Sequence, residues 1–222
     1  SGSGSSGSST TFVGTSAADS EDKSAESDAW KFEGYDGADI FKGGSGNDVF
    51  WGALGNDTLT GNAGQDIFYF QDFTEGKDTI SDFVVGASGD ALKFGGSFTS
   101  AYTRDSTLVD DNGSTGTTYN MATNSNVLPK IFNFTDAFAT AGSTSGVISQ
   151  LTSFVVTTDG TNPISSSADF IVITSTTNDS FVYGWGDSGN GSIDNGELFT
   201  LATLTGVDND SMTASNFAFG SI

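Results

Sequence analysis

Apolar side chains recur every ninth residue in one part of this chain, and glycine and aspartate recur in step with them. Four units of nine residues follow one another between residues 34 and 69: GYDGADIFK, GGSGNDVFW, GALGNDTLT and GNAGQDIFY. In each unit the first and fourth positions are Gly, the sixth is Asp and the eighth is Phe or Leu. A fixed short period predicts a solenoid in which each unit is one structural repeat.

The eighth position of each unit predicts the core of this solenoid. Three residues after each Asp form a short strand, and the middle one points inward, so these apolar side chains stack: Phe41, Phe50, Leu59 and Phe68. The seventh and ninth positions should then face outward, which leaves one surface unusually apolar. That surface either packs against the C-terminal part of the chain or contacts another subunit.

Beyond residue 69 the period stops, and short β-branched and aromatic runs alternate with Gly, Asn and Asp clusters. Such runs are typical of short strands. The sequence therefore predicts an all-β protein, with a short parallel β-roll followed by a β-sandwich-like C-terminal domain. We place the roll and its capping segment at residues 30–94 and the C-terminal domain at residues 95–222. Residues 1–29, which are Ser/Gly-rich and then acidic, are expected to be a linker or assembly arm.

The charge balance points to divalent cations as partners. Lys and Arg number 7 against 28 Asp and Glu, a net charge of −21. Such self-repulsion opposes a compact state unless cations offset it, and without a basic patch nucleic acid is a poor partner. Cys and His are absent, which excludes disulfides and the usual zinc sites. No run approaches the roughly 18 apolar residues of a transmembrane helix.

The repeat columns have the composition of a calcium site. Gly permits turns that other residues resist and exposes carbonyl oxygens inside them, and the Asp adds a carboxylate. Calcium takes six to eight oxygen ligands, more than one turn supplies, so two stacked turns must share an ion. Because successive units lie on opposite sides of a roll, we pair Asp39 with Asp57 and Asp48 with Asp66. Without a cation, stacked Asp side chains would repel one another.

These units resemble the hemolysin-type calcium-binding (RTX) nonapeptide family, whose repeat is GGxGxDxUx. The resemblance covers roughly residues 30–94 and implies a calcium-binding β-roll exported by type I secretion. By the same resemblance, Asp78 and, less strongly, Asp82 cap the final ion. Asp36 either adds a ligand or is solvated. The candidate metal ligands are Asp39, Asp48, Asp57, Asp66, Asp78, Asp82, Asp36, Gly37, Gly44, Gly46, Gly55 and Gly64.

A second acidic loop lies nearer the C-terminus. Its candidate ligands are Asp187, Asn190, Asp194 and Glu197. The loop is similar to an EF-hand loop, but the closing acid falls one residue short. A metal site and a polar β-turn are equally compatible with this sequence.

The residues that carry most enzymatic chemistry are missing. There is no His for general base catalysis, no Cys nucleophile and no GxSxG elbow, so we do not expect an enzyme. Two functions remain open. One is a secreted, calcium-locked structural protein of the bacterial cell surface, an S-layer or filament subunit that self-associates. The other is an export and folding module of a larger toxin, hydrolase or adhesin. Glycans are a further candidate partner, through a flat Thr-rich face.

Overall fold

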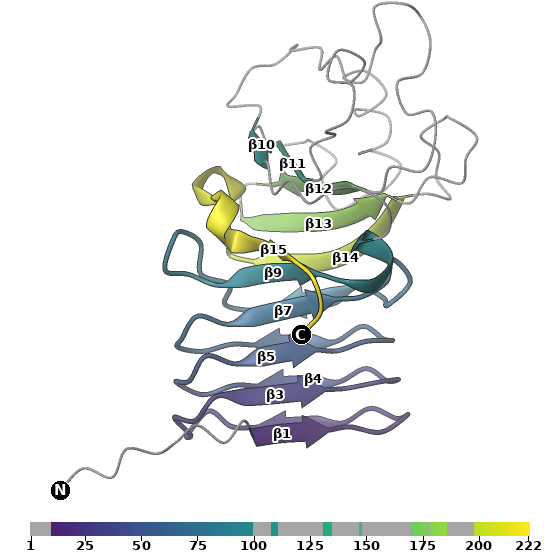
Figure 1. The fold of residues 1–222 in the computed structure, drawn as a ribbon, viewed down its shortest axis with the longest axis vertical. Helices are drawn as coiled ribbons and strands as arrows, with labels where there is room; N and C mark the ends of the chain where they lie inside the picture. The colour runs from purple at the N-terminus through teal and green to yellow at the C-terminus, as the bar shows by residue number, and fades with distance from the viewer. Residues whose placement is uncertain are drawn as a thin grey trace, which may run out of the picture.

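The computed structural model describes residues 10–99, 108–110, 131–134, 147, 170–176, 178–185 and 198–222. Two sheets stack face to face as a solenoid (Figure 1). The first sheet has six strands, in the order β1 (Thr10–Val13), β3 (Trp30–Glu33), β5 (Val49–Trp51), β7 (Ile67–Phe70), β9 (Ala91–Phe94) and β15 (Phe217–Phe219). No helix among these residues is long and apolar enough to cross a membrane.

The second sheet has nine strands and runs from the C-terminal part of the chain back to its beginning. Its order is β10 (Leu108–Asp110), β11 (Ile131–Phe134), β12 (Phe170–Ser175), β13 (Asp179–Trp185), β14 (Leu198–Thr205), β8 (Asp78–Ile80), β6 (Thr58–Thr60), β4 (Ile40–Lys42) and β2 (Ser20–Asp22). Short 3-10 helices lie at η1 (Gly96–Thr99), η3 (Asn209–Ser211) and η4 (Ala214–Asn216).

Successive repeat units alternate between the two sheets. Each strand therefore pairs in parallel with the strand two units away, as in the partners Phe32 and Phe50 or Phe41 and Leu59. The all-β class and the short parallel roll are thus confirmed. The arrangement follows from the sequence because a nine-residue unit contains one turn and one three-residue strand, which is half of a full coil.

The eighth-position side chains fill the space between the sheets, as expected. Phe41, Phe50 and Phe68 are fully buried and Leu59 is 1% exposed. The ring of Phe50 lies between those of Phe32 and Phe68, with centroids 4.8 and 5.2 Å away and planes nearly parallel. This single file of stacked rings is the narrow core of the roll.

The roll begins before residue 30, inside the segment that we expected to be a linker. Phe12 of β1 lies in register with Phe32, and Glu21 of β2 lies in register with Phe41. Backbone pairing does not need large apolar side chains: the N–H of Ile40 donates to the carbonyl of Asp19 (2.9 Å). Composition alone therefore misses these two strands.

Charged side chains lie in the first coil, at the N-terminal end of the roll. Glu21 occupies the inward column, where the later coils have Phe or Leu, and pairs with Lys23 at 2.7 Å. The Lys23 ammonium also lies 4.2 Å above the ring of Trp30. Inward-pointing charge at the end of a sheet disfavours pairing with another chain.

The described C-terminal strands continue the two sheets of the roll. β14 pairs in parallel with β8, and β15 pairs in parallel with β9. The sandwich-like part that we expected therefore shares its sheets and core with the repeats. Leu204 lies in register with Ile80 and Phe217 with Leu92, and all four are buried.

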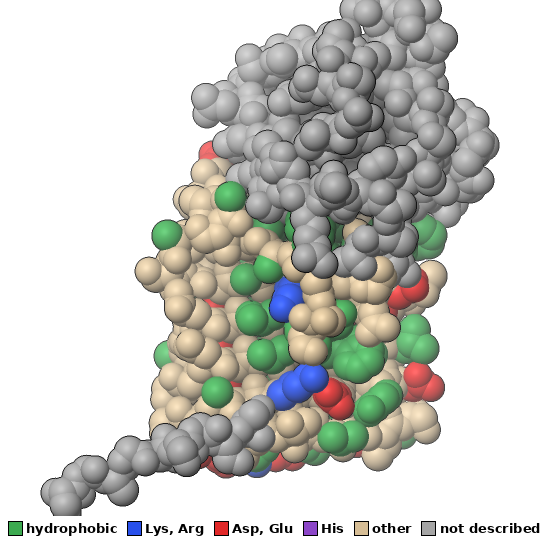
Figure 2. Space-filling model, viewed as in Figure 1, with side chains coloured by type: hydrophobic (Ala, Val, Ile, Leu, Met, Phe, Trp, Pro, Cys, Tyr) green, Lys and Arg blue, Asp and Glu red, His purple; other side chains and the backbone are tan. Residues whose placement is uncertain are grey.

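The outward columns are less exposed than their position suggests. Ile40 is 47% exposed and Trp51 is partly buried, but Tyr69 is only 5% exposed. Trp51 packs edge-on against Tyr69, and the Tyr69 hydroxyl lies where a side chain at Gly95 would stand. At Tyr69 this surface therefore packs against the C-terminal part of the chain, one of the two contacts that the sequence predicts for it. Figure 2 views the sheet that contains β5 and β7, and apolar side chains gather on this face of the molecule.

Candidate metal centre

Each turn between strands has the backbone shape that its glycines permit. Gly37, Gly55 and Gly64, at the fourth position, have φ of 136°, 155° and 140°. At Gly55 a Cβ atom would collide with the carbonyl oxygen of Gly37 in the turn below. Gly55 is therefore required twice, for its φ and for the close approach of successive turns.

The repeat aspartates form two ladders, one along each edge of the roll. The N–H of Asp39 donates to Oδ1 of Asp57, and the N–H of Asp48 donates to Oδ1 of Asp66, both at 2.8 Å. The structure thus brings together the two pairs that the sequence predicts. Each carboxylate uses one oxygen to fix its distance from the next turn.

The second carboxylate oxygen faces into the turn. Oδ2 of Asp39, Asp57 and Asp66 is buried without a hydrogen-bond partner, and each of these residues is 1% exposed. A Cβ atom at the first-position Gly of the same unit would collide with this oxygen. A buried anionic oxygen without a partner is costly, so the turns have the shape and charge to hold a cation.

Carbonyl oxygens of the next turn face the same space. The carbonyl oxygens of Gly52 and Gly61 lie 2.5 and 2.8 Å from where Cβ atoms of Gly34 and Gly43 would stand. No three acidic side chains converge on one point within the described residues. An ion here would therefore take most of its ligands from carbonyl groups, which suits an oxygen-seeking cation of high coordination number such as calcium.

The two capping candidates differ in position. Asp78 is 4% exposed and its Oδ1 accepts a hydrogen bond from the N–H of Asp57 (3.1 Å), so it continues the first ladder. Asp82 lies outside both ladders. Its two oxygens accept from the N–H groups of Gly61 (2.9 Å) and Asn62 (2.7 Å), at the start of the fourth unit.

The other predicted residues are spread over the turns. Asp36 is exposed and pairs through its backbone with Leu54, away from the ladder carboxylates. Gly44 donates its N–H to Oδ2 of Asp48 (2.8 Å), so this oxygen has a hydrogen-bond partner, unlike Oδ2 of the other three repeat aspartates. Gly46 lies against the backbone of Asp28 in the turn below. The second loop, with Asp187, Asn190, Asp194 and Glu197, lies outside the described residues.

Two ladder residues were missed by the sequence analysis. Asp90 accepts from the N–H of Asp66 (2.9 Å) and is 2% exposed, so it continues the second ladder. Asp19 donates its N–H to Oδ1 of Asp39 (2.8 Å) and so begins the first. Each of the two has a weak signal in the sequence. Gly14 and Asp19 are spaced like the first and sixth positions of a unit. Gly86 and Gly89 are spaced like the first and fourth positions, but Asp90 comes one residue earlier than the sixth position would.

Burial controls the electrostatics of both ladders. It raises the pKa of Asp57 to about 6 and that of Asp66 to about 7, and neighbouring carboxylates add to both shifts. The pKa of Asp78 is raised well above its ordinary value, first by burial and then by repulsion from Asp57. Burial likewise raises the pKa of Asp39, Asp48 and Asp90. With pKa values of about 6 and about 7, Asp57 and Asp66 are therefore poised near neutral pH between holding a proton and holding a cation.

We predict that calcium affinity increases as the pH rises from 5 to 8. Below the folded pKa values of Asp57 and Asp66, about 6 and 7, calcium must displace protons. The calcium-free roll should change in the opposite sense. Raised pKa values mean that the folded state takes up protons before the unfolded chain does, so its stability falls as the pH rises through these values. Calcium titrations at pH 5, 6.5 and 8 measure the first effect, and an affinity that does not change with pH would contradict it.

A coiled stack of Gly/Asp turns with buried carboxylate ladders defines a calcium-binding β-roll. Residues 33–68 match the model of the RTX calcium-binding nonapeptide repeat in four copies. This part of the chain is therefore a hemolysin-type RTX repeat region, and its cofactor is Ca²⁺. The repeats are structural, calcium-binding units rather than catalytic ones. No curated protein matches the chain.

Proposed function

We propose that this chain is a calcium-stabilised extracellular structural protein, an S-layer or surface filament subunit that folds and assembles on binding calcium outside the cell. The observation that carries this proposal is the set of buried, unpartnered Oδ2 atoms on Asp39, Asp57 and Asp66. They make the folded roll depend on a cation. Proteins with RTX repeats are typically secreted by the type I route, which suggests an extracellular location.

The ladders suggest which residues hold the ions. On one edge we assign ligands to the turns of Asp39, Asp57 and Asp78, and on the other to the turns of Asp48, Asp66 and Asp90. Carbonyl oxygens of the turn glycines complete each site. We assign Asp36 to the structure of its turn because it is exposed. We assign Asp82 to the start of the fourth unit because its oxygens accept from the N–H groups of Gly61 and Asn62 and it continues neither ladder.

A change in calcium concentration then acts as the folding switch. With a net charge of −21, the chain repels itself at the low calcium concentration inside a cell and stays extended, as passage through a narrow channel requires. Outside, each bound ion neutralises the carboxylates of stacked turns. Because the ligands are in place only in the folded state, the binding free energy stabilises the fold.

Self-association is supported by the side faces of the roll rather than by its N-terminal end. At that end one of the two inward columns ends in Glu21, which pairs with Lys23. On the side, Tyr35 and Leu54 are 44% and 49% exposed, and Tyr35 packs beside Trp51. A second copy placed laterally would bury this apolar surface.

The alternative function is that of an export and folding module of a larger secreted toxin, hydrolase or adhesin. Negative-stain microscopy of the purified chain with calcium and with chelator separates the two. We expect ordered sheets or fibres in calcium that disperse in chelator. Monomers alone in calcium, at concentrations well above micromolar, would contradict assembly and favour the module. Replacing both Tyr35 and Leu54 with Ser should abolish lateral assembly while leaving the calcium-bound fold intact.

A further inference from the structure

The C-terminal segment carries a buried side chain that the repeat function does not use. Asn216 ends η4, immediately before β15, and is fully buried. It lies 130 residues from Gly86 in the sequence, yet it contacts the turn that contains Gly86. This turn, residues 84–90, leads into β9 and contains Asp90, which continues the ladder of Asp66.

The carboxamide of Asn216 pairs with this turn as a peptide group would. Its Oδ1 accepts from the N–H of Gly86 (3.1 Å), and its Nδ2 donates to the carbonyls of Gly86 (3.3 Å) and Asp90 (2.8 Å). Oδ1 also accepts from the N–H of Thr213 (3.0 Å). Asn216 therefore joins the C-terminal segment to the backbone of the turn at three points.

The turn in turn positions the ladder carboxylate of Asp90. The N–H of Val84 donates to Oδ2 of Asp90 (2.8 Å), and the N–H of Asp90 donates to the carbonyl of Val84 (2.7 Å). The other oxygen, Oδ1, accepts from the N–H of Asp66 (2.9 Å). A continuous chain of hydrogen bonds thus runs from Asn216 through Asp90 to Asp66, whose own Oδ2 is buried and unpartnered.

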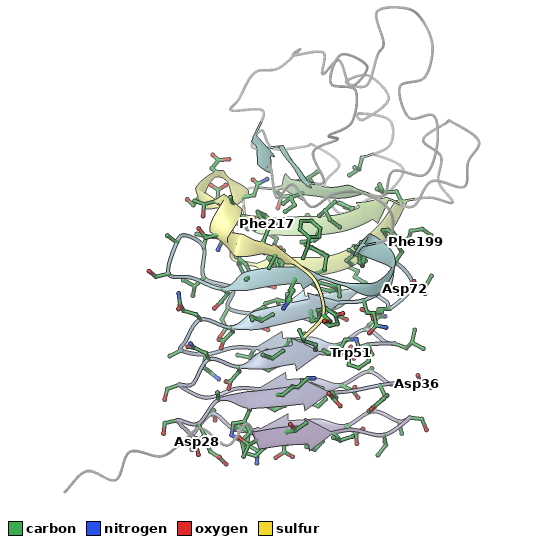
Figure 3. All side chains as sticks on the ribbon, in the orientation of Figure 1. Asp28, Asp36, Trp51, Asp72, Phe199 and Phe217 are labelled. Carbon is green, nitrogen blue, oxygen red and sulfur yellow. The ribbon has the colours of Figure 1, made fainter. Side chains whose placement is uncertain are left out.

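The residues that follow Asn216 dock on the same part of the roll. β15 pairs with β9, Phe217 is 5% exposed, and the N–H of Gly220 donates to the carbonyl of Phe94 (2.9 Å). Figure 3 shows Phe217 where the C-terminal segment joins the sheet. The Asn216 contacts therefore add to strand pairing and to the burial of Phe217 in fastening this segment.

We propose that Asn216 is a positioning residue that couples docking of the C-terminal segment, residues 213–219, to calcium binding at the Asp66 and Asp90 end of the second ladder. The segment is a strap: calcium orders the turn at residues 84–90, the ordered turn accepts Asn216, and the docked segment holds Asp90 in place for the ion. Coupling of this kind is reciprocal: docking strengthens calcium binding by the same factor by which calcium strengthens docking. This inference rests on the proposed assignment of calcium to the ladders.

Removing a ligand from one ladder tests the coupling in the first direction. In Asp66→Asn at saturating calcium, hydrogen exchange of residues 213–219 should accelerate roughly tenfold, within the 5- to 150-fold range of typical coupling. The matched variant Asp39→Asn, on the opposite ladder, should change exchange in this segment far less. Equal acceleration in both variants, or none in either, would overturn the strap.

Removing the strap contact tests the reverse direction. Asn216→Ala should lower calcium affinity at one class of sites roughly tenfold, by the same coupling, whereas Ser215→Ala, an exposed neighbour, should match wild type. If calcium affinity is unchanged in Asn216→Ala but reduced in Asp66→Asn, the strap is refuted while the assignment of calcium to the ladder still holds. Wild-type calcium binding by Asp66→Asn would instead refute the calcium assignment on this ladder. If Asn216→Ala does not fold, the comparison of Asp66→Asn with Asp39→Asn decides.

Discussion

Excess chelator will unfold the roll. Each calcium site that is saturated about a hundredfold above its Kd stabilises the folded state by about 2.7 kcal/mol. Two such sites contribute roughly 5 kcal/mol, comparable with the whole stability of a small domain, about 5–15 kcal/mol. Without ions, the buried carboxylates of both ladders have no compensating charge. Circular dichroism in chelator should therefore show loss of most of the β signal.

Readdition of cations provides the control for this experiment. Calcium should restore the β signal, and magnesium at the same concentration should not, because it requires a compact octahedral site and sheds its waters reluctantly. Lowering the pH to 5 in chelator should restore part of the structure, since protons can then neutralise Asp57 and Asp66. A fully β spectrum in chelator at pH 8 would refute the calcium switch.

Replacement of Phe50 by Ala will cost about 3–5 kcal/mol of unfolding free energy in saturating calcium, the usual range for a buried Phe. Phe50 is fully buried, and its ring stacks on Phe32 and Phe68 on either side. Loss of this ring leaves a cavity between Phe32 and Phe68 and removes both stacking contacts. The inward columns of both sheets meet in this core, and Phe50 is one of its fully buried rings. Denaturant unfolding measures the change.

Ile40→Ala is the matched control, because it removes a large apolar side chain from β4, in the other sheet, at a position 47% exposed. We expect it to cost less than about 1 kcal/mol. If the two variants were equally destabilised, the eighth-position column would not be the core of the roll. Calcium affinity of Ile40→Ala should match that of the wild-type chain.

The periodic part of this fold was predictable from the sequence because a nine-residue period sets both the strand and its partner. Every same-side pair follows from counting units, as for Asp39 with Asp57 or Phe41 with Leu59. The same counting fails where a unit gains or loses a residue. Asp90 follows its Gly pair one residue early, and Asp78 follows an insertion after the fourth unit, although both join the ladders.

Other features could not be predicted because distant residues decide them. Nothing local in residues 198–205 or 217–219 indicates that these strands complete the two sheets of the roll; their partners lie more than a hundred residues earlier. Tyr69 occupies an outward position, yet it is buried where the chain passes close to its hydroxyl at Gly95. Asn216 is an ordinary polar residue in the sequence, and its role depends on the turn at residues 84–90.

The most direct test of the account is the calcium content of the folded protein. After dialysis against trace calcium, we predict that the wild-type chain retains calcium at both ladders. A variant with Asn at the four positions Asp39, Asp48, Asp57 and Asp66 should retain almost none. A wild-type chain that is folded yet holds no calcium, or a fourfold variant that holds as much as wild type, would contradict the assignment of calcium to these turns.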